Sequence, residues 1–332
     1  MTEPTEWVSA SAILNKPSAK NGIRLCIDSR PLNTALKRSK YPIRTVDHLL
    51  TEISNAKVFS SADIKSAFWH IPLDKESSLL TTFNTPLGRM KWNRMPFGIS
   101  VAPEEFQRRI DENLEDDGVK AIADGILIWN DGETIEEATA NHDERPLTLL
   151  ERCKRNIKLG KEKFLLRKTE LSYMGVVLTD KGVKTDSKKQ DCIRSMPATT
   201  NKDEVRRLLS VVTYLSRFSE DLSTKSEQLR TLLKKETAFI WEANEHKGFE
   251  EIKTLISNAP LLKCFNPVET VEIQVDASSS GLGACLMQGN QHIQYASRAL
   301  TETENAIVEF TKRCLVLFMA SLNSTPTLMV EK

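Results

Sequence analysis

The chain has 332 residues, of which 40% are hydrophobic and 27% are charged, and its formal net charge is +1. This length and composition predict roughly two or three folded domains with cores of their own, and they exclude a disordered chain. A net charge so near zero also excludes a polycation, so any affinity for nucleic acid must come from local patches.

The cysteines and the apolar segments indicate in which cellular compartment the protein is expected. The six cysteines are scattered, with no CxxC pair and no histidine pair at metal-ligand spacing, which predicts reduced thiols. No apolar run approaches the ~18 residues of a membrane span, and residues 1–6 lack the basic start and apolar stretch of a signal peptide. We therefore expect a soluble intracellular protein, cytoplasmic or nuclear, without membrane contact.

The part of the chain up to residue 180 alternates short strands and helices. The expected elements are, in chain order, strand 57–60 leading to Asp63, helix 103–114, strands 119–123 and 126–129, helix 141–155 and strand 171–178. This mixture predicts an α+β domain in which helices cover one face of an antiparallel sheet.

Beyond Gly182 the pattern becomes helical. Asn201 and Glu204 stand at the spacing of a capping box, so a helix is expected to begin there. Apolar residues then recur at helical spacing and form one stripe, namely Val205, Leu208, Leu209, Val212, Leu215 and Phe218. A second helix carries Phe249, Ile252, Leu255 and Ile256 and is expected to end before Pro260.

From Val271 the apolar period returns to two, which predicts strands. The expected elements are strand 271–276, a break at 281–283, strands 284–287 and 292–296, and a helix over 304–322.

The turn Ile122-Ala123-Asp124-Gly125 lies between two apolar strands and by itself predicts only a tight hairpin. Other motifs precede it in a fixed order, namely LCIDSRPLN at 25–33, SSADIKSAF at 60–68, TTF at 81–83 and RMPFGISVAP at 94–103. This ordered series resembles a reverse transcriptase. The resemblance is close to the Pol polyproteins of gypsy-type LTR retrotransposons and runs nearly end to end.

The resemblance implies a right-hand polymerase fold. Residues 1–180 would form the fingers and palm, residues 181–268 a helical thumb and connection, and residues 269–332 an incomplete RNase H-like α/β domain. The implied activity is RNA-directed DNA polymerization. The implied partners are an RNA or DNA template–primer duplex and deoxynucleoside triphosphates.

Nucleotide addition to a primer needs two divalent cations, Mg²⁺ or Mn²⁺, and these hard ions prefer oxygen ligands. The resemblance assigns the catalytic, metal-binding carboxylates to Asp63 and Asp124. For Asp63 the residue type also allows a plainer alternative, a helix N-cap, because an aspartate after a strand commonly caps a helix.

The resemblance also assigns a nucleotide pocket. Phe68 would pack under the incoming sugar, Phe97 and Gly98 would let the nucleotide approach the backbone, and Arg24 would meet the triphosphate through its planar guanidinium. From the residues alone, Phe68 is equally a core aromatic, the loop of Phe97 and Gly98 a simple turn, and Arg24 a solvated edge-strand residue.

Contacts with the primer and template are expected in two places. Tyr173-Met174-Gly175 resembles the turn that steadies the primer end, with an ordinary hairpin as the alternative. Lysines and arginines between residues 152 and 168 would bind phosphates without sequence preference, or would form a solvated face, and they are Arg152, Lys154, Arg155, Lys158, Lys161, Lys163, Arg167 and Lys168.

Two positions depart from the family pattern. Gly125 stands where the family has a second aspartate, and losing such a carboxylate should cost activity at least roughly 10–100-fold. We expect glycine to suit a tight hairpin, so that the substitution spares the fold. In the segment QVDASSSGLGA (274–284), Asp276 would be the first metal carboxylate of RNase H, but the next acid position is Thr311, and neither Glu304 nor Glu309 can reach it along a helix.

The sequence therefore predicts impaired polymerization and lost RNA hydrolysis, in a chain that resembles a fragment of a degenerate element or a gene model drawn across one. A non-catalytic nucleic-acid-binding remnant is the main alternative, and a scaffold unrelated to nucleic acid is a third. The sequence leaves the oligomeric state open.

Overall fold

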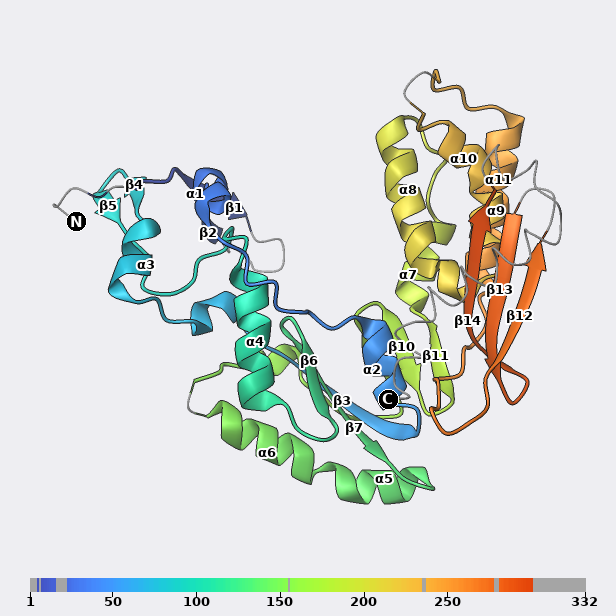
Figure 1. Cartoon of the computed structure of the whole chain (residues 1–332), viewed down its shortest axis with the longest axis horizontal. Coiled ribbons are helices and arrows are strands. Elements are labelled where there is room, and N and C mark those ends of the chain that lie inside the picture. Colours follow the sequence, from blue (N-terminus) through green and yellow to red (C-terminus); the bar gives the residue numbers. More distant parts are fainter. Residues whose placement is uncertain are drawn as a thin grey trace. The chain divides into compact units, whose positions relative to one another are not determined.

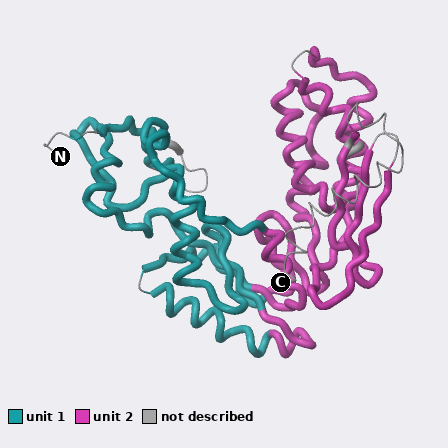
Figure 2. The backbone as a smooth tube through the Cα atoms, viewed as in Figure 1, with its two compact units in different colours: residues 1–45, 60–129, 139–167 teal, residues 46–59, 130–138, 168–332 magenta. Residues whose placement is uncertain are grey.

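The computed structural model describes residues 5, 7–15, 23–154, 156–234, 237–277 and 281–300. The chain divides into two compact units, shown in teal and magenta in Figure 2. Unit 1 comprises Met1–Thr45, Ser60–Trp129 and Thr139–Arg167, and unit 2 comprises Val46–Phe59, Asn130–Ala138 and Lys168–Lys332. The expected domain boundaries at residues 180 and 268 stay predictions.

A four-stranded sheet carries the predicted catalytic residues. Its strands are β3 (Ala56–Asp63), β6 (Val119–Ile122), β7 (Gly125–Asp131) and β8 (Leu165–Lys168), in the order β6-β7-β3-β8. Figure 1 labels β3, β6 and β7. Strand β7 is buried from residue 125 to residue 130, which explains its unbroken apolar run. The predicted strand and hairpin are confirmed.

Helices α4 (Ala102–Leu114) and α6 (Glu144–Cys153) share one apolar core with this sheet. Phe106, Ile110 and Leu114 of α4 are at most 3% exposed, and they pack with Ile126 and Ile128 of β7. Pro103 occupies the first turn of α4, where a missing N–H costs nothing. The predicted helix 103–114 is confirmed within one residue.

Two elements expected as continuous are divided. The helix expected over 141–155 is two helices, α5 (Ile135–His142) and α6, with Asp143 between them bonded to Arg167. The strand expected over 171–178 is a hairpin of β9 (Glu170–Tyr173) and β10 (Val176–Thr179). Met174 (φ 46°) and Gly175 (φ 87°) both have left-handed backbone, as a two-residue hairpin turn requires.

Most of the remaining described elements of unit 1 precede α4 in the chain, and one follows α6. They are β1 (Ser11–Asn15), β2 (Ile23–Ile27), α1 (Arg30–Ala35), the 3₁₀ helix η1 (Ala67–His70), α3 (Lys75–Leu80), β4 (Phe83–Thr85), β5 (Gly88–Met90) and, after α6, the 3₁₀ helix η2 (Lys161–Lys163). Strands β1 and β2 pair antiparallel, as do β4 and β5.

Unit 2 contains two antiparallel sheets and a group of helices. The sheets are β9-β10-β11, with β11 at Gly182–Thr185, and β12 (Glu272–Ala277)-β13 (Gly281–Gln288)-β14 (Gln291–Ala299). The helices are α2 (Val46–Glu52), α7 (Ser187–Arg194), α8 (Lys202–Leu215), η3 (Ser216–Phe218), α9 (Leu222–Lys225), α10 (Glu227–Thr231) and α11 (Ala243–Ser257).

The predicted helical stripe is confirmed, because all six of its residues are at most 5% exposed. The predicted cap at α8 is half right: the Asn201 side chain accepts from the Glu204 N–H at 2.9 Å, whereas the Glu204 carboxylate accepts from Thr200. Residues 281–283, expected as a break, belong to β13.

The helix expected over 304–322 lies outside the described residues. Among described residues, no helix is both long and apolar enough to cross a membrane.

A buried histidine ties α5 to the central sheet. His142 and Ser60 are both fully buried, and His142 Nε2 lies 2.6 Å from Ser60 Oγ. Because Ser60 Oγ also accepts from the Arg167 N–H at 3.0 Å, its hydroxyl proton is available for Nε2, which favours the neutral imidazole. Burial lowers the pKa of His142; the charge of Asp143 opposes this shift, and the charges of Arg145 and Arg167 add to it.

We expect this histidine to make the protein less stable in mild acid. A lowered folded-state pKa means that the stabilization is complete above the unfolded pKa of about 6.5 and is lost as the pH falls through the folded pKa, by at most about 1.4 kcal/mol per pH unit. The measurement is urea unfolding of the natural chain and His142→Gln between pH 8 and pH 5, roughly spanning this titration.

The stability difference between the two proteins should shrink as the pH falls. His246, exposed on α11, offers a matched control, and His246→Gln should leave the pH dependence unchanged. A constant difference between the natural chain and His142→Gln would contradict the neutral, buried imidazole.

Candidate active site

The structure brings Asp63 and Asp124 to the same end of the central sheet. Asp63 is the last residue of β3, and Asp124 lies in the turn between β6 and β7. The N–H of Ile64 donates to the carbonyl oxygen of Asp124 at 2.8 Å, so the backbones at the two carboxylates are directly bonded. This juxtaposition was expected only from the family resemblance, and hydrogen bonding between neighbouring strands produces it.

A later segment runs beside Asp63. The Lys65 N–H donates to the Lys158 carbonyl at 2.8 Å, and the Gly160 N–H donates to the Asp63 carbonyl at 2.8 Å. Helix η2 follows immediately and carries Lys163. The backbone therefore fixes the place from which the lysine side chain extends.

The Lys163 ammonium forms an ion pair with Asp63 Oδ2. The hydrogen bond to Asp63 and the negative charge of that carboxylate raise the pKa of Lys163, and the charge of Asp124 adds to the shift. The Asp63 side chain is 32% exposed and that of Lys163 is 70% exposed, so solvent reaches the pair. Sequence reasoning missed this partner, because it had placed Lys163 among the phosphate-binding cations.

The turn itself differs from expectation. Gly125 is the first residue of β7 and pairs with Ile122, so the two turn residues are Ala123 and Asp124. The left-handed conformation that a tight hairpin needs is adopted by Ala123, with φ 52°. The expectation that Gly125 supplies the turn geometry was therefore wrong. Glycine offers no side-chain ligand, and the expected loss of activity stays a prediction.

Asp63 and Asp124 supply the oxygen ligands that Mg²⁺ or Mn²⁺ prefers, but the set is short. No group of three histidine, cysteine, aspartate or glutamate side chains among the described residues could hold a metal ion. Asp63 is also engaged with Lys163. The described residues therefore do not fit a two-ion site.

An aromatic cluster includes Phe68, which follows shortly after Asp63 in the sequence. Phe68, on η1, is half-buried, and its ring centroid is 5.2 Å from that of Phe97 and 5.9 Å from that of Phe106. The structure therefore brings together Phe68 and Phe97, two residues of the predicted nucleotide pocket. Phe68 also packs on the core, so the plainer alternative is partly true.

Gly98 is held by residues that sequence reasoning gave no role. Its carbonyl accepts from Ser29 Oγ at 2.5 Å and from Asn33 Nδ2 at 2.9 Å, and Asn33 Oδ1 accepts from the Ser100 N–H at 2.8 Å. Gly98 has φ 106°, and a Cβ there would lie 3.0 Å from Ser29 Oγ. Both contacts come from the 25–33 motif, which was the available signal.

Arg24 lies in β2 with its backbone opposite Leu14. Its predicted contact with a triphosphate stays a prediction.

The predicted primer turn belongs to unit 2. The carbonyl of Met174 accepts from Tyr214 Oη of α8 at 2.7 Å, and Lys189 Nζ of α7 lies 4.1 Å from the centre of the Tyr214 ring. Tyr173 is buried. The turn is thus a braced hairpin, and its contact with a primer end stays a prediction.

Most cations of the basic run are already engaged within the protein. Arg152, Lys154, Lys163 and Arg167 form ion pairs with Asp116, Glu151, Asp63 and Asp143 respectively. Within the described part of this run, Lys158, Lys161 and Lys168 form no ion pair, and Arg155 lies outside it.

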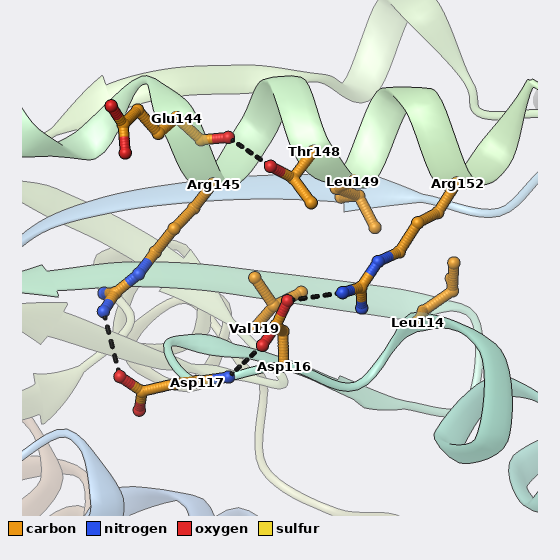
Figure 3. A pocket seen from close by; sticks show the side chains of 9 residues that line it. All are labelled: Leu114, Asp116, Asp117, Val119, Glu144, Arg145, Thr148, Leu149 and Arg152. Carbon is orange, nitrogen blue, oxygen red and sulfur yellow. Dashed lines mark hydrogen bonds and ion pairs between the residues drawn. The ribbon is translucent and has the colours of Figure 1, made fainter.

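Figure 3 shows how one of these pairs, Arg152 with Asp116, and a further pair, Arg145 with Asp117, line a pocket of about 250 Å³. Arg145 and Arg152 extend from α6 to Asp117 and Asp116, at 3.2 Å and 2.6 Å. These guanidiniums fasten α6 to the residues before β6. Neither predicted catalytic carboxylate lines this pocket.

In the C-terminal sheet, Asp276 is exposed on β12 opposite Gly283, and its Oδ1 accepts from the Ala277 N–H at 2.9 Å. Thr311, Glu304 and Glu309 lie outside the described residues. The metal-binding role of Asp276 stays a prediction.

We expect Gly98→Ala to destabilize the protein by about 1–3 kcal/mol, because it combines left-handed strain with a close contact to Ser29. Gly88→Ala is the matched control: Gly88 has φ 109°, and a Cβ there would have nothing within 4 Å. The measurement is urea unfolding of both variants. An equal loss in both would show that backbone strain alone is responsible, and that the Ser29 contact adds nothing.

Comparison with known proteins identifies two regions. Residues 14–178 match the family of reverse transcriptases (RNA-dependent DNA polymerases), and residues 241–332 match the RNase H-like domain found in reverse transcriptase. The retrovirus-related Pol polyprotein from transposon 412 of Drosophila melanogaster is 32% identical over 294 residues, which cover 87% of this chain and 23% of that protein. The transposon Tf2-7 polyprotein of Schizosaccharomyces pombe is 27% identical over 87% of this chain and 22% of its own length.

Solved structures confirm the fold. The foamy viral protease-reverse transcriptase in complex with an RNA/DNA hybrid matches with a TM-score of 0.87 at 20% identity, over 100% of this chain and 45% of that one. The same enzyme's dRH form in complex with double-stranded DNA gives 0.88 at 20% identity, over 99% of this chain and 58% of that one. This likeness confirms the α+β polymerase fold followed by an RNase H-like region.

The chain spans 22–31% of the length of these and other curated relatives, which include the Pol polyprotein from transposon opus of Drosophila melanogaster. The reverse transcriptase family generally uses divalent metal ions. The ordered motifs, the fold and the matches agree: the chain is similar to part of retrotransposon Pol polyproteins, and it belongs to the reverse transcriptase family, with an RNase H-like domain match at residues 241–332.

Proposed function

We propose that the chain binds a template–primer duplex and acts as an RNA-directed DNA polymerase whose nucleotidyl transfer is impaired. The observation that carries this proposal is the backbone bond that sets Asp63 and Asp124 side by side, with Gly125 at the following position. In this proposal, the backbone holds the two aspartates together, and the carboxylate expected at the position of Gly125 is absent.

The nucleotide is proposed to enter over the aromatic cluster. Phe68 and Phe97 would contact the sugar and base, Gly98 would leave the backbone open to them, and Arg24 would meet the phosphates. A divalent cation, Mg²⁺ or Mn²⁺, would depend on Asp63 and Asp124 and would have to compete with Lys163. Both the shortage of ligands and this competition weaken the site.

The duplex is proposed to lie on unpaired cations. Lys158 and Lys161 are exposed, flank the segment beside Asp63 and form no described ion pair, which suits contact with phosphates. Tyr173, Met174 and Gly175 would support the primer end. The foamy viral enzyme of the same fold is described in complex with RNA/DNA hybrid and with double-stranded DNA, which supports this choice of partner.

RNA hydrolysis is proposed to be lost. Asp276 would provide one metal ligand, but the position of the next acid is occupied by Thr311. A threonine hydroxyl cannot replace a carboxylate charge at a cation site.

The second candidate function is a non-catalytic protein that retains duplex binding. The ion pair between Lys163 and Asp63 favours it, because the carboxylate already has a cation partner. The two functions differ in whether the bound primer is extended.

We expect primer extension on an RNA template to be weak for the natural chain and to rise at least about 10-fold in Gly125→Asp, because the change restores a carboxylate beside Asp124. The assay uses Mg²⁺ and Mn²⁺ in parallel, and Asp63→Ala serves as the inactive reference. Extension by the natural chain that Asp63→Ala leaves intact would disprove the assigned site. If Gly125→Asp binds duplex but extends no primer, the non-catalytic function holds.

We expect duplex binding to depend steeply on salt, and to lose about one unit of its log–log salt slope for each phosphate-contacting lysine removed. Lys158→Gln with Lys161→Gln should therefore lower the slope by about two. Lys154→Gln is the matched control, because its ammonium is already paired with Glu151. Binding isotherms at several salt concentrations give the slopes, and equal slopes for all variants would place the phosphates elsewhere.

A further inference from the structure

We infer that Lys163 is a built-in counter-ion of the catalytic carboxylates, and that its ammonium takes the place at Asp63 that a divalent cation needs. This inference rests on the proposed function in one respect, the assignment of Asp63 and Asp124 as the carboxylate pair. It adds a named competitor for the cation.

The lysine is placed by the backbone and is more than a chance surface contact. Residues 158–160 run antiparallel to residues 63–65, with Ile64 bridged to Leu159 and two backbone hydrogen bonds of 2.8 Å around that bridge. The Lys163 N–H then donates to the Gly160 carbonyl at 3.1 Å, which closes η2. Lys163 is thus one helical turn beyond a residue bonded to the Asp63 main chain.

The charges favour this arrangement once the third carboxylate is gone. Two carboxylates carry two negative charges, and one ammonium bonded to Asp63 and attracted by Asp124 neutralizes half of them. A further aspartate at position 125 would favour a doubly charged ion over a singly charged one. With Gly125, the advantage of the divalent ion falls and the tethered ammonium remains.

The covalent attachment of Lys163 to the chain also favours its ammonium over a free cation. Lys163 needs no association step, whereas a free cation must lose part of its water shell to bind, which Mg²⁺ does reluctantly. The pair is nevertheless exposed to solvent, with Lys163 70% exposed, so screening keeps the ammonium displaceable. We therefore expect weak divalent binding that improves when the ammonium is removed.

The test measures Mn²⁺ binding to the full chain by electron paramagnetic resonance of the free ion, at low ionic strength and without nucleic acid. Lys163→Gln should tighten binding by about three- to tenfold, because it removes both the ion pair and the repulsion of the dication. Lys163→Met, which keeps the methylene stem, should do the same. The readout needs no polymerase activity.

Lys154→Gln is the matched control. It removes the same charge from an exposed lysine whose ion pair is with Glu151, which is not a carboxylate of the site, and it should change affinity by less than about twofold. In an Asp63→Asn background, Lys163→Gln should bring no further gain, because the two residues act as a pair.

Equal affinity of the natural chain and both Lys163 variants would overturn the inference, as would an equal gain from Lys154→Gln. Failure of primer extension is a separate result, because extension can be absent while Mn²⁺ affinity still rises in Lys163→Gln. If Asp63→Asn leaves Mn²⁺ affinity unchanged, the carboxylate assignment itself is wrong, and with it the proposed function.

Discussion

The candidate site depends on one main-chain hydrogen bond, from the Ile64 N–H to the Asp124 carbonyl. It joins the end of β3 to the turn between β6 and β7. Buried residues anchor β3 and β7, for example Val58 of β3 and Ile126 of β7. Because this bond involves no side chain, the identity of residue 125 does not control it. The sheet can therefore keep the backbone geometry of the site while the side chains at its positions change.

Loss of a carboxylate alters more than the number of ligands. At a cluster of like charges, each carboxylate makes the others costlier to keep together, and a cation relieves that cost. Asp63 and Asp124 need less relief than three acids would, and Lys163 supplies it from within the chain. In the proposed site, glycine at position 125 would therefore both weaken divalent binding and leave the internal ammonium as a sufficient partner.

Local sequence signals predicted the hairpin, α4 and the buried stripe of α8, because each depends on a periodicity within one element. Interactions between distant segments were beyond such signals. Lys163 reaches Asp63 across 100 positions, and Ser29 reaches Gly98 across 69. The apolar run over 171–178 predicted one continuous strand, whereas the structure has the hairpin that was the stated alternative for 173–175. A methionine rarely adopts left-handed backbone, so only Gly175 marked the turn locally. The family resemblance supplied the pairing of Asp63 with Asp124, which spacing could not.

The basic run shows why counting charges overstates a nucleic-acid surface. Arg152, Lys154 and Arg167 look available in sequence, yet each already has a carboxylate of the same chain within reach. A phosphate would have to replace an existing ion pair there, with little net gain in an exposed setting. Lys158 and Lys161 have no such partner to give up, and they lie on the segment bonded to residues 63–65. Within the basic run, the two lysines proposed to contact a duplex thus lie beside Asp63.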